Sequence, residues 1–365
     1  MKKMIRQTCF GMVAMMGILM LAGCGSGNTG SSNTSQTTAA AEQKADAGND
    51  VESGSPSIEK LTLVTTTSQV TGGPTQMLQE AITKAAEGNE MFEFTHYDNS
   101  TLFKSSEEFQ ALMDHDVDIA FLPTSYLYDN GALWCDMYSM TYLFDSPQQI
   151  AEFFDPYSET GKTFAQKVYD EFHFWPITSF DLSTRNVWLA KDKDVRTPDD
   201  LKGILCRVPN GASWVKMGQS IGVSATSLDS NEVYLGMQTG TIEAQENNMI
   251  SSYANALQEV TKTIVLTGHQ YNFNLVCVAG DVWDALNDAQ KDELTRVIVE
   301  AVKENDAAVQ AKEADILKEC EERGIRIQTP DVEAFKTYAR EFYLASEEAK
   351  DWDMDTYNTI ISSGN

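Results

Sequence analysis

The sequence predicts an α/β fold with a parallel sheet, and two observations carry this prediction. Residues 61–65, 92–97 and 117–121 are short runs rich in β-branched and aromatic residues, as expected of strands. Helical patterns over residues 74–87 and 107–113 separate these runs. Strands that alternate with helices in this way form a parallel sheet covered by helices, and such sheets bind ligands at the carboxyl ends of their strands.

The second half of the chain repeats the alternation. Further strands are predicted over residues 184–190, 205–208 and 241–245. A long helical pattern over residues 288–323 ends before Gly324. At about 1.5 Å per residue, this helix is long enough to lie across two domains.

The first 57 residues predict an export and anchoring segment. Basic residues within the first six positions, an uncharged apolar run over residues 8–21 and the small residues before Cys24 form the pattern of a lipoprotein signal peptide. The run is shorter than the about 20 residues of a membrane-spanning helix, although an uncleaved anchor is the alternative. We therefore expect removal of residues 1–23, lipid on Cys24 and a flexible stalk over residues 24–57. The folded part would then lie outside the cytoplasm, anchored to a membrane.

The chain is strongly acidic, with 27 Lys and Arg residues, 54 Asp and Glu residues and a net charge of −27. Removal of residues 1–23 takes away three positive charges and leaves −30. This excess disfavours nucleic acid and anionic lipid surfaces as partners. An anionic ligand would therefore need a local cationic pocket, which is feasible because salt screens distant charges over about 8 Å.

The sequence lacks the signatures of a metalloprotein or an enzyme. Its four histidines are scattered singly, and no nucleophile elbow, phosphate-binding loop or zinc-protease motif occurs. Cys135, Cys206, Cys277 and Cys320 could form two disulfides in three ways, but the apolar sequences around Cys206 and Cys277 favour free, buried thiols. We expect a binding protein without a cofactor or a metal ion. An extracytoplasmic hydrolase with a carboxylate pair is the enzyme alternative.

Arg207 is the candidate binding residue that the sequence alone identifies. It lies in the otherwise apolar run 204–208, just before Pro209, and a buried guanidinium must be paired. The helix that begins near Ala212 would direct free backbone amides to the same region, and both features suit a carboxylate. An internal salt bridge is the alternative for Arg207.

Residues 198–269 carry the motifs of a known family. These motifs are Pro198-Asp199-Asp200-Leu201-Lys202-Gly203, Arg207-Val208-Pro209-Asn210, Glu232-Val233-Tyr234, Gln238-Thr239-Gly240, Gln245-Glu246-Asn247 and Leu266-Thr267-Gly268-His269. With this spacing the chain resembles the solute-binding proteins of tripartite ATP-independent periplasmic (TRAP) transporters, of the dicarboxylate-binding (DctP) type. The resemblance implies a two-lobed periplasmic-binding-protein-like fold of type II, with the long helix spanning both lobes. It assigns residues 58–182 with 273–312 to lobe I, and residues 183–272 with 313–365 to lobe II.

The resemblance also implies the ligand-binding residues of lobe II. Arg207 matches the arginine whose guanidinium grips the ligand carboxylate, and Asn210 and Asn247 match polar positions of the pocket. Arg185 matches a second arginine, which either touches the ligand or supports the pocket. The ligand itself would be a small organic carboxylate.

Two expectations concern lobe I, and one departure from the family concerns the ligand. Thr66, after the first strand, and Tyr126, after the third, stand where the family lines its cleft, although both could be ordinary loop residues. Ser230 stands where many members place a phenylalanine against the ligand. The smaller side chain enlarges or wets the pocket, so the ligand class stays open.

The function implied by the resemblance is solute capture for uptake. The protein would bind a carboxylate outside the cytoplasm and deliver it to TRAP-type permease subunits driven by an ion gradient. A binding protein for an ATP-driven importer or a sensor kinase shares the lobed architecture and is the alternative.

Overall fold

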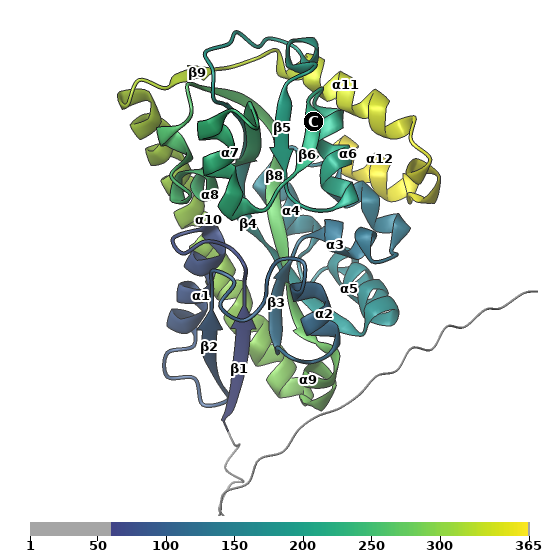
Figure 1. Ribbon diagram of the computed structural model, residues 1–365. Coiled ribbons are helices and arrows are strands. Elements are labelled where there is room, and N and C mark those ends of the chain that lie inside the picture. Colours follow the sequence, from purple (N-terminus) through teal and green to yellow (C-terminus); the bar gives the residue numbers. More distant parts are fainter. Residues whose placement is uncertain (1–59, 364–365) are drawn as a thin grey trace, which may run out of the picture. The chain divides into compact units, whose positions relative to one another are not determined.

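A nine-stranded mixed sheet forms the centre of residues 60–363, the part of the chain that the computed structural model describes (Figure 1). Its strands are β1 (Leu61–Thr66), β2 (Phe92–Tyr97), β3 (Ile119–Leu122), β4 (Phe174–Leu189), β5 (Leu205–Val208), β6 (Ser224–Ser227), β7 (Ala244–Asn248), β8 (Thr263–Ala279) and β9 (Arg326–Gln328). Their order is β2-β1-β3-β8-β4-β7-β5-β6, with β9 paired to β8. The α/β class is confirmed. The sheet is mixed rather than parallel, because β8 runs antiparallel to β3 and to β4, and β4 runs antiparallel to β7.

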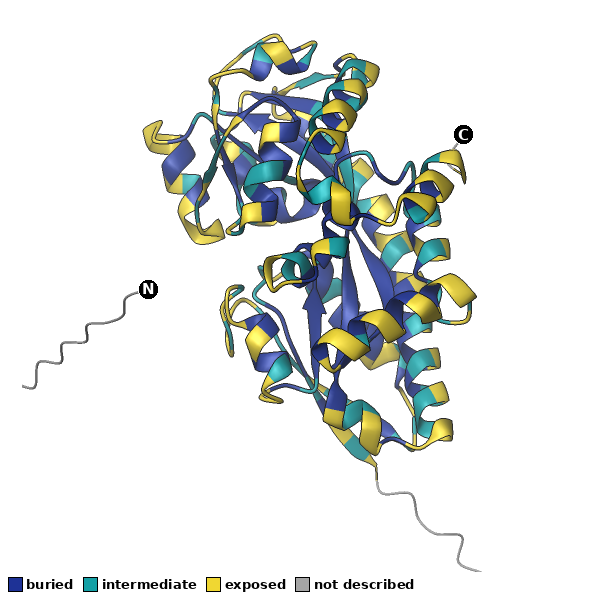
Figure 2. Ribbon diagram, turned by 90° about the vertical axis from the view of Figure 1, so that its right-hand side faces the viewer, coloured by how far each residue is buried: buried dark blue, intermediate teal, exposed yellow. Residues whose placement is uncertain are grey.

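The long strands β4 and β8 join two lobes (Figure 2). They contain 16 and 17 residues, whereas a strand usually has about five or six. In lobe I, β3 pairs with the second half of β8, and β1 and β2 extend the sheet beyond β3. In lobe II, β7 pairs with the second half of β4, and β5 and β6 extend the sheet beyond β7. The β4–β8 ladder shifts register between Asp181 and Thr184, where Ser183 has a φ of +78° that is uncommon for a non-glycine residue.

Helices cover both faces of the sheet (Figure 1). The α-helices are α1 (Pro74–Ala85), α2 (Glu108–Met113), α3 (Thr124–Asp129), α4 (Pro147–Phe153), α5 (Glu159–Phe172), α6 (Ala212–Ser220), α7 (Val233–Thr239), α8 (Met249–Ala254), α9 (Gly280–Ala285), α10 (Asp288–Glu322), α11 (Val332–Leu344) and α12 (Met354–Ser363). Short 3₁₀ helices are η1 (Leu133–Ser139), η2 (Pro198–Leu201), η3 (Ser230–Glu232), η4 (Leu257–Glu259) and η5 (Glu348–Asp351). No helix within the described residues is long and apolar enough to span a bilayer.

Helix α10 confirms the predicted long helix and its place across both lobes. The Asn287 side chain caps its N-terminus by accepting from the Gln290 N–H at 3.0 Å. Near its start, Leu294 packs in a hydrophobic cluster with side chains of β1 and α1. Near its end, Val309 and Ile316 pack in a second cluster, which belongs to lobe II. One helix therefore contributes to the cores of both lobes.

Two strands begin far from their predicted starts, whereas the bounds of β1 and β3 differ from the prediction by one or two residues. β4 begins at Phe174, ten residues before the predicted strand 184–190, because residues 174–182 are almost all buried and continue the ladder with β8. β7 begins at Ala244 rather than at residue 241. Gly240, with a φ of +78°, ends α7 and redirects the chain, so the turn takes up the first residues of the predicted strand.

The end of the chain also packs differently from the prediction. Residues 313–365 are expected in lobe II, and Phe335 of α11 does pack there, in a cluster with Cys206. Tyr357 and Ile360 of α12, however, pack in the lobe I cluster with Phe154. The chain thus returns to lobe I within α11, whose Tyr343 packs in the same cluster, and the other lobe boundaries stay predictions.

The four cysteines of the fold are free and buried, as expected. Cys206 lies in β5 and Cys277 in β8, and burial raises the pKa of both thiols. These thiols are therefore packed core groups rather than reactive nucleophiles. The predicted signal peptide (1–23), the lipidation site Cys24 and the stalk (24–57) lie outside the described residues.

Candidate functional site

A cavity of about 100 Å³ between the lobes is the candidate ligand site. Its volume is sufficient for several water molecules, since one needs roughly 10–15 Å³. Five of the six residues predicted to bind the ligand line it, namely Arg185, Arg207, Asn210, Asn247 and Tyr126. They come from four different elements and the segment after β5, which the fold brings together at one place.

A larger cavity of about 930 Å³ lies in lobe I beside Trp175 and Trp283. The charged side chains in its wall are exposed or only half buried. In the interlobe cavity, by contrast, Arg185 and Arg207 are 3% and 4% exposed. A buried charge at a cavity wall is the stronger sign of a ligand site, because the protein must offset its desolvation.

Arg207 holds an unpaired guanidinium at the wall of the interlobe cavity. Its backbone pairs with Gln245 of β7 and Thr226 of β6, and its Nε donates to the Leu228 carbonyl at 2.8 Å. Its Nη1 and Nη2 have no hydrogen-bond partner and no ion pair among the described residues. Burial lowers the pKa of Arg207 to about 10, so the group stays cationic at neutral pH. The internal salt bridge, the alternative for Arg207, is not formed among residues 60–363.

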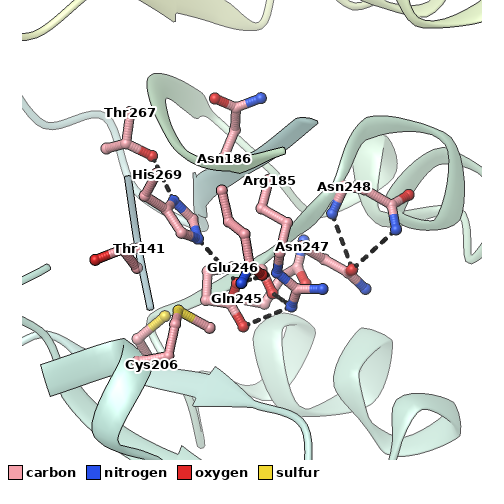
Figure 3. A network of polar contacts seen from close by, with 12 residues as sticks. Thr141, Arg185, Asn186, Cys206, Gln245, Glu246, Asn247, Asn248, Thr267 and His269 are labelled. Carbon is pink, nitrogen blue, oxygen red and sulfur yellow. Dashed lines mark hydrogen bonds and ion pairs between the residues drawn. The ribbon is translucent and has the colours of Figure 1, made fainter. Parts of the chain in front are cut away.

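Arg185, on β4, belongs to a buried ionic network (Figure 3). Its Nε and Nη2 each donate to a carboxylate oxygen of Glu246 at 2.7 Å. The His269 Nε2 lies 3.1 Å from Glu246 Oε2, and its Nδ1 lies 2.8 Å from the Thr267 hydroxyl. The Trp214 ring lies against the Arg185 guanidinium, with 4.6 Å between Cζ and the ring centre. Arg185 is thus fixed by the protein itself, and direct contact with a ligand stays a prediction.

The charges of this network cancel within it. Burial favours a raised pKa for Glu246, but the Arg185 guanidinium and the hydrogen bond from His269 outweigh burial and lower the pKa. Burial also lowers the pKa of His269, more strongly than Glu246 raises it. At neutral pH Glu246 is therefore an anion and His269 is neutral, so that Nε2–H donates to Glu246 and Nδ1 accepts from Thr267. Glu246 and Asp229 also favour the charged form of Arg207, but Arg207 forms no ion pair among the described residues.

Two asparagines of lobe II present amide groups to the cavity. Asn210 donates through Nδ2 to Asp229 Oδ1 at 2.5 Å. The Asn247 Oδ1 accepts from the Asn248 backbone N–H at 2.8 Å. This contact sets the orientation of the Asn247 amide and leaves its Nδ2 as a donor without a partner among the described residues. A carboxylate beside Arg207 could accept from this donor.

Lobe I brings Tyr126 to the cavity wall but not Thr66. Tyr126 lies on α3, and burial raises the pKa of its phenol. Thr66 is the last residue of β1 and is fully buried, and its Oγ1 has no partner in the described part of the chain. The chain reaches the cavity at Ser68, two residues later. Thr66 therefore does not line this cavity, and its contact with a ligand stays a prediction.

Several residues of the wall escaped the sequence analysis as binding residues. Asn272 and Asn274 of β8 line the cavity, and Asn274 donates to the Phe121 carbonyl at 2.9 Å. Their alternation directly before the apolar run 275–279 was a usable signal. Glu108 of α2 also lines the cavity. One glutamate among 54 acidic residues gave no such signal.

Residues 62–350 match the family described as bacterial extracellular solute-binding protein, family 7 (DctP). This match covers well over half of the sequence. The chain belongs to this family. The predicted resemblance to TRAP solute-binding proteins is thereby confirmed.

Two relatives illustrate the range of family 7. The sialic acid-binding periplasmic protein SiaP of Vibrio cholerae is 24% identical over 205 residues, which is 56% of this chain and 61% of SiaP. The 2,3-diketo-L-gulonate-binding periplasmic protein YiaO of Escherichia coli is 30% identical over 135 residues, which is 37% of this chain and 41% of YiaO. The chain thus matches less than two thirds of the length of either relative.

Solved structures confirm the two-lobed fold. A TRAP periplasmic solute-binding protein from Roseobacter denitrificans, with bound 3-deoxy-D-manno-oct-2-ulosonic acid, has a TM-score of 0.77 and 26% identity. That alignment covers 82% of this chain and 98% of the other. A TRAP periplasmic solute-binding protein from Shewanella oneidensis, with bound succinate, has a TM-score of 0.74 at 14% identity, with 84% and 100% covered. The second comparison shows the fold alone.

Proposed function

We propose that this family 7 protein binds a small organic carboxylate between its lobes and delivers it to a TRAP-type permease driven by an ion gradient. The Arg207 guanidinium carries the proposal, since Arg207 lines the cavity and its Nη1 and Nη2 have no partner among the described residues. A carboxylate could accept from an arginine in a bidentate pair, which is stronger than a neutral hydrogen bond. It would also compensate a charge that is already desolvated.

The neighbouring residues have distinct parts in this proposal. The free Nδ2 of Asn247 would donate to the same carboxylate, whereas Asn210 and Tyr126 would shape the wall. Arg185, neutralised by Glu246, would support the pocket and contribute little net charge. The relative solved with 3-deoxy-D-manno-oct-2-ulosonic acid supports a small organic acid as the ligand.

The proposal includes a lipid anchor on Cys24. The basic, apolar and small residues that precede Cys24 support it, and an anchored receptor would stay close to its permease. Labelling of cells with a radioactive or alkyne-bearing fatty acid should mark the wild-type protein but not the Cys24→Ala variant. Equal labelling of both would exclude this anchor.

Ligand binding by Arg207 variants tests the central claim. Native mass spectrometry of the purified protein first identifies any acid that copurifies, and calorimetry then measures the affinity for that acid, D-glucuronate and succinate. Arg207→Lys keeps the charge but loses the planar fork, so affinity should fall by about 2 kcal/mol or more, roughly 30-fold. Arg196→Lys, an exposed arginine of lobe II, is the matched control. Unchanged affinity in folded Arg207→Lys and Arg207→Ala would exclude the proposed site.

A further inference from the structure

The lobe I wall of the cavity contains an acidic group and no cation. Glu108 and Ser68 are part of this wall. Among the residues that line the cavity, the cations are Arg185 and Arg207, both from lobe II, and Arg185 is already paired with Glu246. A ligand therefore finds one cation that has no ion-pair partner among the described residues, and the far end of the ligand meets the acidic wall.

Glu108 is fixed in this wall by its contacts with one residue. It is the first residue of α2 and is 4% exposed. Its Oε1 accepts a hydrogen bond from the Ser68 backbone N–H, and its Oε2 lies 3.1 Å from the Ser68 Oγ. These contacts use two of the about four acceptor positions of a carboxyl group, so hydrogen-bonding capacity remains for a ligand.

The protonation of Glu108 adds to this capacity. Burial raises the pKa of Glu108 to about 8, more than the hydrogen bonds from Ser68 lower it. At neutral pH the group is therefore mainly a protonated carboxyl, which both donates and accepts. A hydroxyl group has the same two properties. A second carboxylate on the ligand would lose its hydration on entering the cavity, and the lobe I wall offers no cation to compensate that loss. Deprotonation of Glu108 would add repulsion between two anions.

We infer that Glu108 determines the specificity of this cavity, selecting carboxylates whose far end carries hydroxyl groups over those that end in a second carboxylate. The inference rests on the proposed function, because it takes Arg207 as the anchor of the first carboxylate. The proposed selectivity depends on the chemical group at the far end of the ligand and not on the length of the ligand. It also makes the two lobes chemically complementary, with the anion bound on lobe II and the hydroxyl groups on lobe I.

Acids of equal length but different ends test this inference. D-Erythronate and succinate each have four carbons, and L-galactonate and adipate each have six. Calorimetry on the wild-type protein at pH 7 should show each hydroxy acid that binds to be at least about tenfold tighter than the dicarboxylate of the same length. If a dicarboxylate binds as tightly as its counterpart or more tightly, the inference is wrong while the proposed function stands. If none of the four acids and no copurifying acid binds, the proposed function itself fails.

Variants of two adjacent glutamates separate recognition from structural support. Glu108→Gln keeps the size and one acceptor, and we expect a roughly fivefold to tenfold loss of hydroxy-acid affinity without a loss of dicarboxylate affinity. Glu107→Gln alters the exposed neighbour and should change neither affinity. Equal loss for both classes of acid would mean that Glu108 only supports the Ser68 segment, and would overturn the inference. If Glu108→Gln does not fold, Glu108→Asp, which withdraws the carboxyl group, should show the same selective loss.

Discussion

Arg185 and Arg207 line the same cavity, yet the protein treats their charges differently. Two nitrogens of Arg185 lie 2.7 Å from Glu246, whereas Arg207 has one backbone carbonyl as its partner. Both side chains are almost fully buried, so both lose their hydration on folding. The chain supplies the anion for Arg185. Under the proposed function, the ligand supplies the anion for Arg207.

This difference separates a structural charge from a binding charge. A buried ion pair that is already complete holds the geometry of the site, and removal of one partner leaves the other charge uncompensated. A buried cation without an anion lowers the stability of the empty protein. A ligand that supplies the anion removes this unfavourable term, so the same term strengthens ligand binding. Burial and residue type are the same for both arginines, so the partner decides the role.

The largest expected effect is on the stability of the empty protein. Arg185→Met leaves the Glu246 carboxylate buried without its partner, and we expect the free energy of unfolding to fall by about 3–5 kcal/mol. Arg207→Met removes a charge that has no ion-pair partner among the described residues, so its change should stay within about 1 kcal/mol or be stabilising. Urea unfolding of both variants, after removal of any bound ligand, measures the two changes.

Methionine is the appropriate replacement in both cases because it keeps most of the length of the arginine stem. The lost packing is therefore similar, and the comparison isolates the charge. Equal destabilisation by the two substitutions would show that Arg185 and Arg207 are both structural. A larger loss for Arg207→Met would reverse the assignment of the two roles.

A smaller effect is expected in a double-mutant cycle of the paired arginine. Arg185→Met and Glu246→Gln each leave one buried charge alone, but the double variant leaves neither. We expect the double variant to be about 1–3 kcal/mol more stable than the sum of the single losses predicts. The matched cycle of Arg207→Met with Glu246→Gln should show a smaller coupling, since those two side chains interact through space without a hydrogen bond or ion pair in the described part of the chain. Comparable coupling in the two cycles would contradict the distinction between the arginines.

The sequence predicted several of the elements where their signals are local. β2 and β5 have their predicted bounds, and α10 differs from its predicted end by one residue. The antiparallel course of β4 and β8 was not predicted, since pairing of strands about 80 residues apart leaves no local pattern. The return of α12 to lobe I has the same cause. A segment with apolar residues does not specify which of two cores it will join.

The candidate site was predictable where one residue contrasts with its neighbours. Arg207 stands out in an apolar strand, and the structure brings it to the cavity. Glu108 stands among many acidic residues, and its burial depends on the loop at Ser68, which is distant in sequence. The partner of Arg185 could not be assigned from sequence either. That assignment needs the register of β4 and β7, in which Arg185 lies opposite Asn248.

The smallest expected effect is on the pH dependence of stability, and it concerns the Arg185 network. Burial lowers the pKa of His269 below its usual 6.5. Between the lowered pKa and 6.5 the unfolded chain binds more protons than the folded one, so the free energy of unfolding falls as the pH drops below 6.5. The pKa of Glu246 is also lowered, below 4.5. Its stabilising contribution is therefore present above pH 4.5 and is lost as the pH falls through the lowered value.

Urea unfolding of His269→Gln between pH 4.5 and 7.5 can isolate the histidine contribution. Glutamine keeps a donor for Glu246 but does not titrate, so the difference in unfolding free energy between wild type and variant should shrink or reverse as the pH falls below 6.5. The difference is the correct readout, because Asp181, whose pKa burial raises to about 7, gives a slope of the opposite sign that both proteins share.

Arg207→Met should keep the wild-type slope, since Arg207 has no contact with His269. A pH-independent difference between wild type and His269→Gln would show that His269 is not forced to stay neutral by the fold, and the charge balance around Arg185 would need revision.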